Sequence, residues 1–427
     1  MAEAGEGRVR GLKVAVIGGS IAGCTMAIEL ERAGCDVTLF ERAGEELKDR
    51  GAGIAVPPSV IETLIRRDLV DADTPCLSAE KELRIWRAAD ELRCGRVAWA
   101  QPSAYRFLNW GHLYRNLRKR LSDDVYWFRH RVSAVRETPG GTVGVQLSGG
   151  QVRDFELVVC ADGHRSVGRR TLFPEIQPEY AGYVLWRGAL AERALEECAA
   201  LEGVAARPGF PGGSALFYLV PGMGGSVEPG ARMVNWSLYT QVPDPNEFLT
   251  DKAGRIHDGS LSTAAMPPGR EASLKRLARE VLPDFYAGIV DQSPNTFVHA
   301  VLDCEVPAYR RGRICLAGDA GALARPHAGS GALKGMRNAI ALAEALRAGP
   351  TIEDALAHWS DWQTAACNDL VRLGRQLGRA LVTEIPDWSR MDEAGMEKWF
   401  RSVVTVPSET FDPGGPGDPG GFPNPRA

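Results

Sequence analysis

The stretch from Leu12 to Arg42 constrains the fold more than any other part of the chain. A short apolar run, Val14 to Ile17, ends in two glycines, and a segment with helical spacing follows. A second apolar run then ends in Glu41. This order of strand, tight turn, helix and strand is typical of the first half of a dinucleotide-binding fold.

The turn has the sequence GGSIAG, so a serine replaces the middle glycine of the G-x-G-x-x-G pattern. The first glycine lets the chain turn sharply, and the last lets the helix lie close to the sheet. Free N–H groups at the helix start attract a pyrophosphate, and an acidic residue at the second strand end can accept hydrogen bonds from a ribose. The turn alone leaves FAD, NAD, NADP and a Gly-rich turn without a ligand as alternatives. The predicted contacts are Gly18, Ser20, Ile21, Ala22, Gly23 and Glu41.

Composition sets limits on the class of protein. The chain has 427 residues, 44% hydrophobic and 24% charged, as expected for a globular protein of two or three domains. A net charge of -4 gives no electrostatic case for nucleic acid or an anionic membrane surface. The nine cysteines include no C-x-x-C pair, which favours reduced thiols over disulfides or a metal site. Without a signal peptide or a long apolar stretch, we expect a cytoplasmic monomer or homodimer.

Two later segments repeat the pattern of a buried strand that ends near an acidic residue. Leu157 to Cys160 runs into Asp162, and a second apolar strand runs into Gly318 and Asp319. Ligands bind at the carboxyl ends of strands in open α/β sheets, although Asp-Gly is also a common turn dipeptide. A second helix start, with its own glycines, follows Asp319. A ligand held by two such distant units must be long, which favours FAD over NAD.

Residues 174–299 have a different character. Strand-like runs rich in aromatic residues alternate with Gly/Pro loops, and helical stretches are expected over 191–200 and 272–281. This pattern predicts an antiparallel sheet in a second domain. A sheet face carrying Trp186, Tyr218 and Trp236 would wall a pocket for a flat organic substrate, with a plain core stripe as the alternative.

Together these segments predict an α/β fold with an α+β second domain. A Rossmann-like FAD-binding domain would comprise residues 1–81, 109–173 and 300–346. The antiparallel-sheet substrate domain would comprise residues 174–299 with an excursion at 82–108. C-terminal helices are expected over 347–385, followed by a Pro/Gly-rich tail over 386–427.

Three motifs occur in order along the chain. They are GGSIAG with Glu41, D-G-x-x-S-x-x-R starting at Asp162, and Gly318-Asp319 followed by P-x-x-G-x-G starting at Pro326. This set resembles the group A FAD-dependent aromatic monooxygenases of the para-hydroxybenzoate hydroxylase type, over about residues 10–385. Residues 110–118 and 180–188 are similar to the 2,6-dihydroxypyridine 3-hydroxylase branch of that family.

The resemblance implies roles for individual residues. Glu41 would hold the adenosine ribose, Arg42 and Arg115 the adenosine and pyrophosphate side, and Asp319 the ribityl or pyrophosphate portion. Asp162 would serve both FAD and NAD(P)H. Further contacts with FAD are expected from Arg50, Gly329, Gly331 and Leu333.

The resemblance also implies a reaction. NADPH or NADH would reduce FAD, and a flavin hydroperoxide formed with O2 would transfer one oxygen atom to an electron-rich aromatic small molecule. The substrate domain would close near Pro326. His327 is the candidate to polarise or deprotonate a phenolic substrate, with a structural histidine as the alternative.

Two residues depart from the family pattern, because Lys334 and Asn338 stand where asparagine and aspartate are usual. Lys334 would either stabilise an anionic reduced flavin or point to solvent, and we expect solvent. The alternatives to a hydroxylase are a flavin oxidase or epoxidase on the same scaffold, and a flavin-binding protein without turnover.

Overall fold

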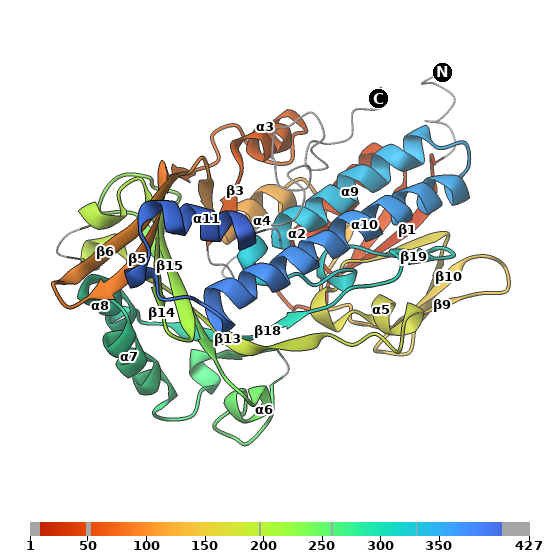
Figure 1. Ribbon diagram of the computed structural model, residues 1–427. Coiled ribbons are helices and arrows are strands. Elements are labelled where there is room, and N and C mark those ends of the chain that lie inside the picture. Colours follow the sequence, from red (N-terminus) through yellow and green to blue (C-terminus); the bar gives the residue numbers. More distant parts are fainter. Residues whose placement is uncertain (1–8, 48–52, 196–197, 258, 330, 404–427) are drawn as a thin grey trace.

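The structure is a computed structural model that describes residues 9–47, 53–195, 198–257, 259–329 and 331–403 (Figure 1). Within them the predicted combination of a largely parallel sheet, an antiparallel sheet and C-terminal helices is confirmed. Arg50, a predicted cofactor contact, lies outside the described residues. No helix in the described ranges is long and apolar enough to cross a membrane.

A six-stranded sheet carries the first glycine-rich turn. Its order is β19-β20-β12-β1-β2-β8, and all neighbours run parallel except β19 and β20. The central strands are apolar and buried, as a sheet covered on both faces requires. The carboxyl ends of β1, β2, β12 and β20 therefore share one edge of the sheet. The strands are β1 (Lys13–Ile17), β2 (Asp36–Phe40), β8 (Tyr126–Trp127), β12 (Leu157–Cys160), β19 (Arg310–Arg311) and β20 (Ile314–Leu316).

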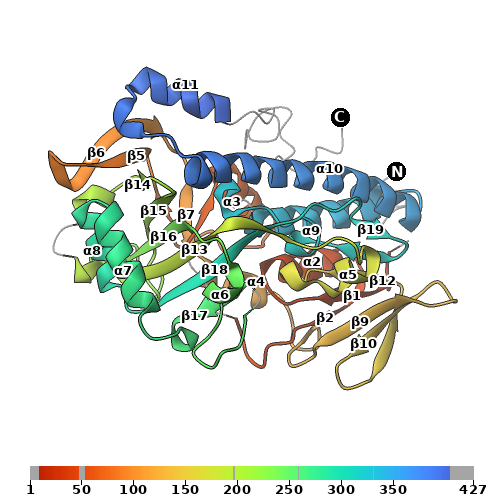
Figure 2. The same ribbon diagram turned by 60° about the horizontal axis from the view of Figure 1, so that its bottom comes forward.

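Three long helices cover this sheet. Helices α2 (Ile21–Arg32) and α9 (Gly331–Ala348) pack against each other, and α10 (Ile352–Gly378) runs alongside α9 (Figure 1, Figure 2). Thr351 starts α10 by accepting a hydrogen bond from the backbone N–H of Asp354. The remaining helices are α3 (Pro58–Arg66), α4 (Trp110–Arg118), α5 (Val167–Leu172), α6 (Pro245–Phe248), α7 (Arg270–Val281), α8 (Asp284–Gln292) and α11 (Glu393–Val403).

An eight-stranded sheet dominates the other half of the molecule. Its order is β17-β18-β13-β16-β15-β14-β5-β6, and only β14 and β5 pair in parallel. The early segment β5–β6 thus pairs with strands that come later in the chain. The residue limits expected for the two domains stay a prediction. The strands are β5 (Lys81–Ala88), β6 (Glu91–Pro102), β13 (Glu179–Ala191), β14 (Val204–Phe210), β15 (Gly213–Val220), β16 (Met233–Gln241), β17 (Ser260–Ser262) and β18 (Thr296–Asp303).

Two small sheets complete the described part of the fold, and one of them touches the large sheet. Gly53 in β3 donates its N–H to Asn235 of β16 at 2.8 Å, so β3 lies against one face of the eight-stranded sheet. The small sheets contain β3 (Gly53–Val56), β4 (Leu77–Ser78) and β7 (Arg106–Asn109), and β9 (Val132–Glu137), β10 (Val143–Leu147) and β11 (Val152–Phe155).

The two faces of the eight-stranded sheet have different neighbours. Trp186 and Trp236 lie in the core shared with α7 and α8, where Trp236 Nε1 donates to Ser293 Oγ at 2.7 Å. Tyr218 faces the other way and stacks on Phe107 with ring centres 4.2 Å apart. The prediction that Trp186 and Trp236 line the same pocket as Tyr218 is therefore wrong, because side chains alternate along each strand and the register puts these tryptophans on the opposite face.

The helix expected over 191–200 is also wrong. The described residues there form two short 3₁₀ turns, η2 (Glu192–Ala194) and η3 (Ala199–Leu201). Glu192 accepts two hydrogen bonds from Arg232, at 2.5 and 2.8 Å, and one from the Gly230 N–H at 2.7 Å. These contacts hold the segment to the residues just before β16 and outweigh its helical propensity. The stretch 272–281 is helical as expected, in α7.

We expect Trp236→Phe to lower the free energy of unfolding by about 2 kcal/mol, because it removes a buried hydrogen bond and leaves a void. Urea unfolding followed by circular dichroism measures this loss. Trp99→Phe is the matched control on the half-buried edge strand β6, and it should cost less than about 1 kcal/mol. Equal losses in the two variants would contradict the buried role of Trp236.

Candidate functional site

The first glycine-rich turn leaves the N-terminus of α2 open. Gly18 has a φ of 101°, and a Cβ there would lie 2.5 Å from the carbonyl oxygen of Ala161, so only glycine fits. A Cβ on Gly23 would lie 1.7 Å from the Gly18 carbonyl oxygen. Ser20 occupies the N-cap position, but its side chain accepts no backbone hydrogen bond. The N–H groups of the first helical turn, from Ile21, Ala22 and Gly23, therefore remain available to an anion.

Glu41 closes β2 and holds this turn in place. Its buried carboxylate accepts hydrogen bonds from the backbone N–H groups of Gly19 and Ala43, both at 2.7 Å. Tyr126 from β8 donates its hydroxyl proton to the Gly19 carbonyl oxygen at 2.8 Å. The carboxylate is thereby fixed at the strand end, where its remaining lone pairs can accept the hydroxyl groups of a ribose.

The two predicted cationic contacts flank this point. Arg42 follows Glu41 and is exposed, whereas Arg115 is half-buried on α4, a helix that packs against α2. Neither arginine forms an ion pair with a carboxylate in the part of the chain that the structure describes. Both charges are therefore free to attract phosphate groups, and their contact with the cofactor stays a prediction.

The Asp-Gly turn after β12 leaves one buried oxygen without a partner. Asp162 Oδ2 accepts a hydrogen bond from the Val167 N–H at 2.7 Å. Its Oδ1 is buried and accepts no hydrogen bond from any residue in the described ranges. Burial raises the pKa of this carboxyl group above its usual value. A hydroxyl group of a bound ligand would satisfy the orphaned oxygen.

Arg169 links this turn to the next strand end. Its buried guanidinium donates to the carbonyl oxygens of Asp319 at 3.0 Å and Ala320 at 3.1 Å, and also to that of His164. The loops after β12 and β20 are thus held in a fixed relation. Arg169 is the last residue of the D-G-x-x-S-x-x-R motif, but no role was expected for it or for Tyr126, because the partners of both are backbone atoms distant in the chain.

Helix α9 carries a buried cation behind Asp319. Lys334 is 1% exposed, and its Nζ donates to Asp319 Oδ1 at 2.9 Å and to the carbonyl oxygen of Ala322. The expectation that Lys334 points to solvent is therefore wrong. Asn338, one turn later, accepts from the Gly318 N–H at 2.8 Å and donates to Gln363 at 2.6 Å. The amide accepts and donates at once, whereas an ionised aspartate at this position would lack the donor.

The starts of α2 and α9 lie side by side. A Cβ on Gly335 in α9 would lie 2.4 Å from the Cβ of Ala22, and one on Gly318 would lie 3.3 Å from the same atom. The structure therefore brings the first helical turn of α2 against α9 and the loop that holds Asp319. These residues fit FAD, because N–H donors suit its pyrophosphate and carboxylate acceptors suit its ribose and ribityl hydroxyl groups. Contacts of Gly329, Gly331 and Leu333 with the flavin ring stay predictions.

The loop before α9 contains the two predicted catalytic residues. Pro326 is exposed at the start of η6 (Pro326–Ala328). The His327 ring lies over Tyr239 with centres 4.1 Å apart, and its Nε2 is 3.1 Å from the Tyr183 hydroxyl oxygen. Burial, followed by the charges of Arg207 and Arg325, lowers the pKa of His327 to about 3. Such an imidazole stays neutral near pH 7 and is a poor base, and the expected role of His327 in polarising or deprotonating a substrate stays a prediction.

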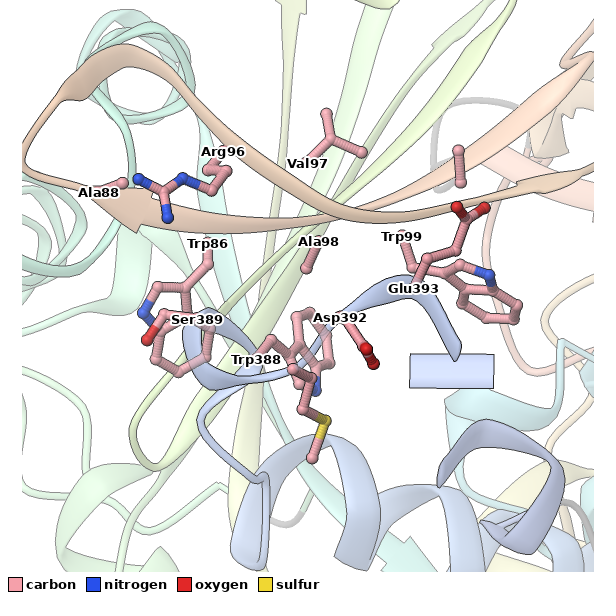
Figure 3. A pocket seen from close by; sticks show the side chains of 12 residues that line it. Trp86, Ala88, Arg96, Val97, Ala98, Trp99, Trp388, Ser389, Asp392 and Glu393 are labelled. Carbon is pink, nitrogen blue, oxygen red and sulfur yellow. The ribbon is translucent and has the colours of Figure 1, made fainter. Parts of the chain in front are cut away.

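A separate hollow lies away from all of these residues. A groove of about 410 Å³ runs between β6 and the segment that leads into α11 (Figure 3). Trp86, Trp99 and Trp388 contribute to its lining, together with charged residues such as Arg96 and Glu393. None of the predicted cofactor contacts lines it.

Comparison with known proteins agrees with the fit to FAD. Residues 13–56 match the family model described as pyridine nucleotide-disulphide oxidoreductase, and residues 180–303 match the model described as FAD binding domain-like. The chain is 29% identical over 358 residues to 2,6-dihydroxypyridine 3-monooxygenase of Paenarthrobacter nicotinovorans, which covers 82% of this chain and 87% of that protein. The structure of 2,6-dihydroxypyridine-3-hydroxylase from Arthrobacter nicotinovorans has a TM-score of 0.79 at 26% identity, covering 86% of this chain and 92% of that one.

Over most of its length the chain is similar to FAD-dependent aromatic monooxygenases. A further relative is a 3-amino-4-hydroxybenzoate 2-monooxygenase from Streptomyces platensis, 27% identical over 392 residues, or 88% of this chain and 90% of that protein. The predicted resemblance to this family, FAD as the cofactor and the enzyme class are thereby confirmed. In flavoprotein hydroxylases the cofactor supplies the redox chemistry and the protein supplies binding and orientation, and the contacts of the residues above with FAD stay predictions.

We expect Glu41→Ala to weaken FAD binding by about 10- to 100-fold, because hydrogen bonds to a charged group contribute about 1.5–3 kcal/mol. Titration of the apoprotein with FAD, followed by flavin fluorescence, measures the affinity. Glu41→Gln keeps one acceptor oxygen and should lose less, whereas Glu45→Ala on the exposed loop should change nothing. Unchanged FAD affinity in Glu41→Ala would contradict the assignment.

The stability of the protein should fall steadily on acidification below about pH 6.5. Burial lowers the pKa values of His299 and His327 to about 3, so between these limits the unfolded chain binds protons that the folded chain excludes. Each histidine then removes up to about 1.4 kcal/mol of stability per pH unit. Urea unfolding at several pH values measures how steeply the free energy of unfolding falls with falling pH. This dependence should be shallower in the double variant His299→Gln/His327→Gln than in the wild type. The exposed His358→Gln is the control and should keep the original slope.

Proposed function

We propose that this monooxygenase uses NADPH or NADH to insert one oxygen atom of O2 into an electron-rich aromatic or heteroaromatic small molecule. The observation that carries the proposal is that the N-terminal turns of α2 and α9 lie side by side. There the α2 N–H donors and the carboxylates of Glu41, Asp162 and Asp319 follow the carboxyl ends of neighbouring strands of one sheet, where a long cofactor would bind.

The overall reaction balances as a ring C–H, O2, NAD(P)H and a proton giving a ring C–OH, water and NAD(P)⁺. Bound FAD supplies hydride acceptance from NAD(P)H and activation of O2. The α2 N-terminus, Arg42 and Arg115 would bind the pyrophosphate and adenosine side. Glu41, Asp162 and Asp319 would accept hydroxyl groups, and backbone atoms at Gly329, Gly331 and Leu333 would approach the ring.

For the oxygen transfer, the chain itself would supply an aromatic surface that positions the substrate and excludes water. The rings of Tyr183, Tyr239 and His327, the residue after Pro326, pack against one another in edge-on and tilted arrangements. Burial raises the pKa values of Tyr183 and Tyr239 above the usual value, so all three rings are uncharged near neutral pH. Because His327 Nδ1 is buried without a partner in the described part of the chain, we assign it a hydrogen bond to a substrate hydroxyl rather than proton removal.

The purified protein should carry FAD and oxidise NAD(P)H at least about tenfold faster when a true substrate is present. A panel of phenols, hydroxypyridines and polycyclic aromatics, assayed under ¹⁸O2, should yield about one labelled product molecule per NAD(P)H. Full recovery of the electrons as hydrogen peroxide with every compound would favour an oxidase. Absence of NAD(P)H oxidation throughout would favour a flavin-binding protein without turnover.

A further inference from the structure

The groove beside α11 lies at the β6 edge of the eight-stranded sheet (Figure 3). One side is β6, the last strand in the order of that sheet, and the other is η8 (Trp388–Arg390) with the start of α11. Three tryptophans from three elements line it. Trp86 on β5 and Trp99 on β6 share one face of the sheet, because Arg84, two residues before Trp86, is the register partner of Trp99. The ring centre of Trp388 is 6.0 Å from that of Trp86.

The two tryptophans of the sheet keep part of their surface exposed. Trp86 and Trp99 are half-buried, whereas Trp388 is buried. Figure 3 shows Trp86 and Ala98 pointing from the sheet toward Trp388, so aromatic and small apolar side chains meet across the hollow. An apolar group that covered the exposed indole surface would gain about 25 cal/mol per Å². Grooves lined by aromatic rings are typical binding sites of proline-rich segments in the polyproline II conformation.

The sequence after α11 contains such a proline-rich segment. Residues 404–427 lie outside the described residues, and six of them are prolines. A polyproline II helix has three residues per turn, so residues at every third position share one edge of it. From position 413 to position 425 every third residue is proline or phenylalanine, namely Pro413, Pro416, Pro419, Phe422 and Pro425. A linker without a binding role needs no such period.

The segment begins close enough to reach the groove of the same molecule. Helix α11 packs along β6 (Figure 2), and Glu393 at its start lines the groove, whereas Val403 is its last residue. The 11 residues of α11 span about 16 Å. Residues 404–412 span up to about 30 Å when extended, which is enough to return along α11. A tether this short gives a high effective concentration, so a chain's own segment binds in preference to that of another molecule.

We infer that residues 413–425 bind in this groove of their own chain as a polyproline II segment, with the proline edge against Trp86 and Trp99. The conformation suits the site, because its backbone makes no internal hydrogen bonds and its carbonyl groups are available to indole N–H donors. Prolines also reduce the conformational entropy that the segment loses on binding. None of the predicted cofactor contacts lines the groove, so the inference goes beyond the proposed function and its test needs no turnover.

The indole N–H signals of tryptophan test the contact in the full-length, FAD-loaded protein. The triple proline variant for this test is Pro413→Ala/Pro416→Ala/Pro419→Ala. It keeps the charge and the length of the chain and removes only proline rings from the segment. In ¹⁵N-labelled protein the signals of Trp86 and Trp99, assigned with Trp86→Phe and Trp99→Phe, should move between the wild type and the triple proline variant. Trp236 is the internal control, because it lies in the core on the other face of the sheet, and its signal should not move.

A labelled peptide with the sequence of residues 404–427 tests the groove itself. Its anisotropy should show binding to the triple proline variant at least about tenfold tighter than to the wild type, whose groove its own segment occupies. Ala98→Gln, added to the triple proline variant, places a longer side chain in the groove and should weaken the peptide about tenfold or more. Leu92→Gln is the matched control, because Leu92 is exposed on the same strand and does not line the groove.

A peptide with the same three Pro→Ala changes needs no altered protein, and it should bind the triple proline variant about tenfold more weakly than the natural peptide. Unmoved Trp86 and Trp99 signals, no binding of the natural peptide to the triple proline variant, or equal affinity for this variant and the wild type would each overturn the inference. Indole signals that change with protein concentration, together with a dimer that the triple proline variant lacks, would place the segment in the groove of a second copy. That outcome would overturn binding within one chain.

Discussion

The close approach of α2 and α9 is the contact on which the cofactor site depends. Ala22 and Gly335 meet where neither helix has room for a larger side chain, and Gly318 packs against the same methyl group. This contact joins a strand–turn–helix unit near the N-terminus to another near the C-terminus. Without this contact, Glu41 and Asp319 would lie at the ends of strands whose helices are not packed together. With it, the two helix starts lie close enough to act on one ligand.

Backbone atoms, rather than side-chain pairs, hold the loops of this edge together. Glu41 accepts a hydrogen bond from the Gly19 N–H, and Asn338 accepts one from the Gly318 N–H. Arg169 donates to the carbonyl oxygens of two loops. Such contacts fix loop positions with little freedom for rotation, which a site for a rigid cofactor requires. They also explain why Lys334 and Asn338 do not damage the site. Lys334 neutralises Asp319 from the buried side, and the amide of Asn338 satisfies partners on both of its sides.

The cofactor edge could be predicted from the sequence because its signals are local. A glycine, a short apolar run and an acidic residue at a strand end lie within a few positions of one another, and their meaning follows from the geometry of one turn. The substrate face could not be predicted in the same way. Whether Trp236 or Asn235 faces the pocket depends on the register between β15 and β16 and on which face α7 and α8 cover. The burial of Lys334 likewise depends on a carbonyl group in a distant loop.

The polar groups left without partners show what kinds of ligand complete the site. In the described ranges Asp162 Oδ1 is a buried acceptor without a donor, at the edge that fits a cofactor rich in hydroxyl groups. In the same ranges Arg187 Nε is a buried donor without an acceptor, on the aromatic face of the eight-stranded sheet. The first group needs a donor and the second needs an acceptor, so ligands of different character would satisfy the two positions.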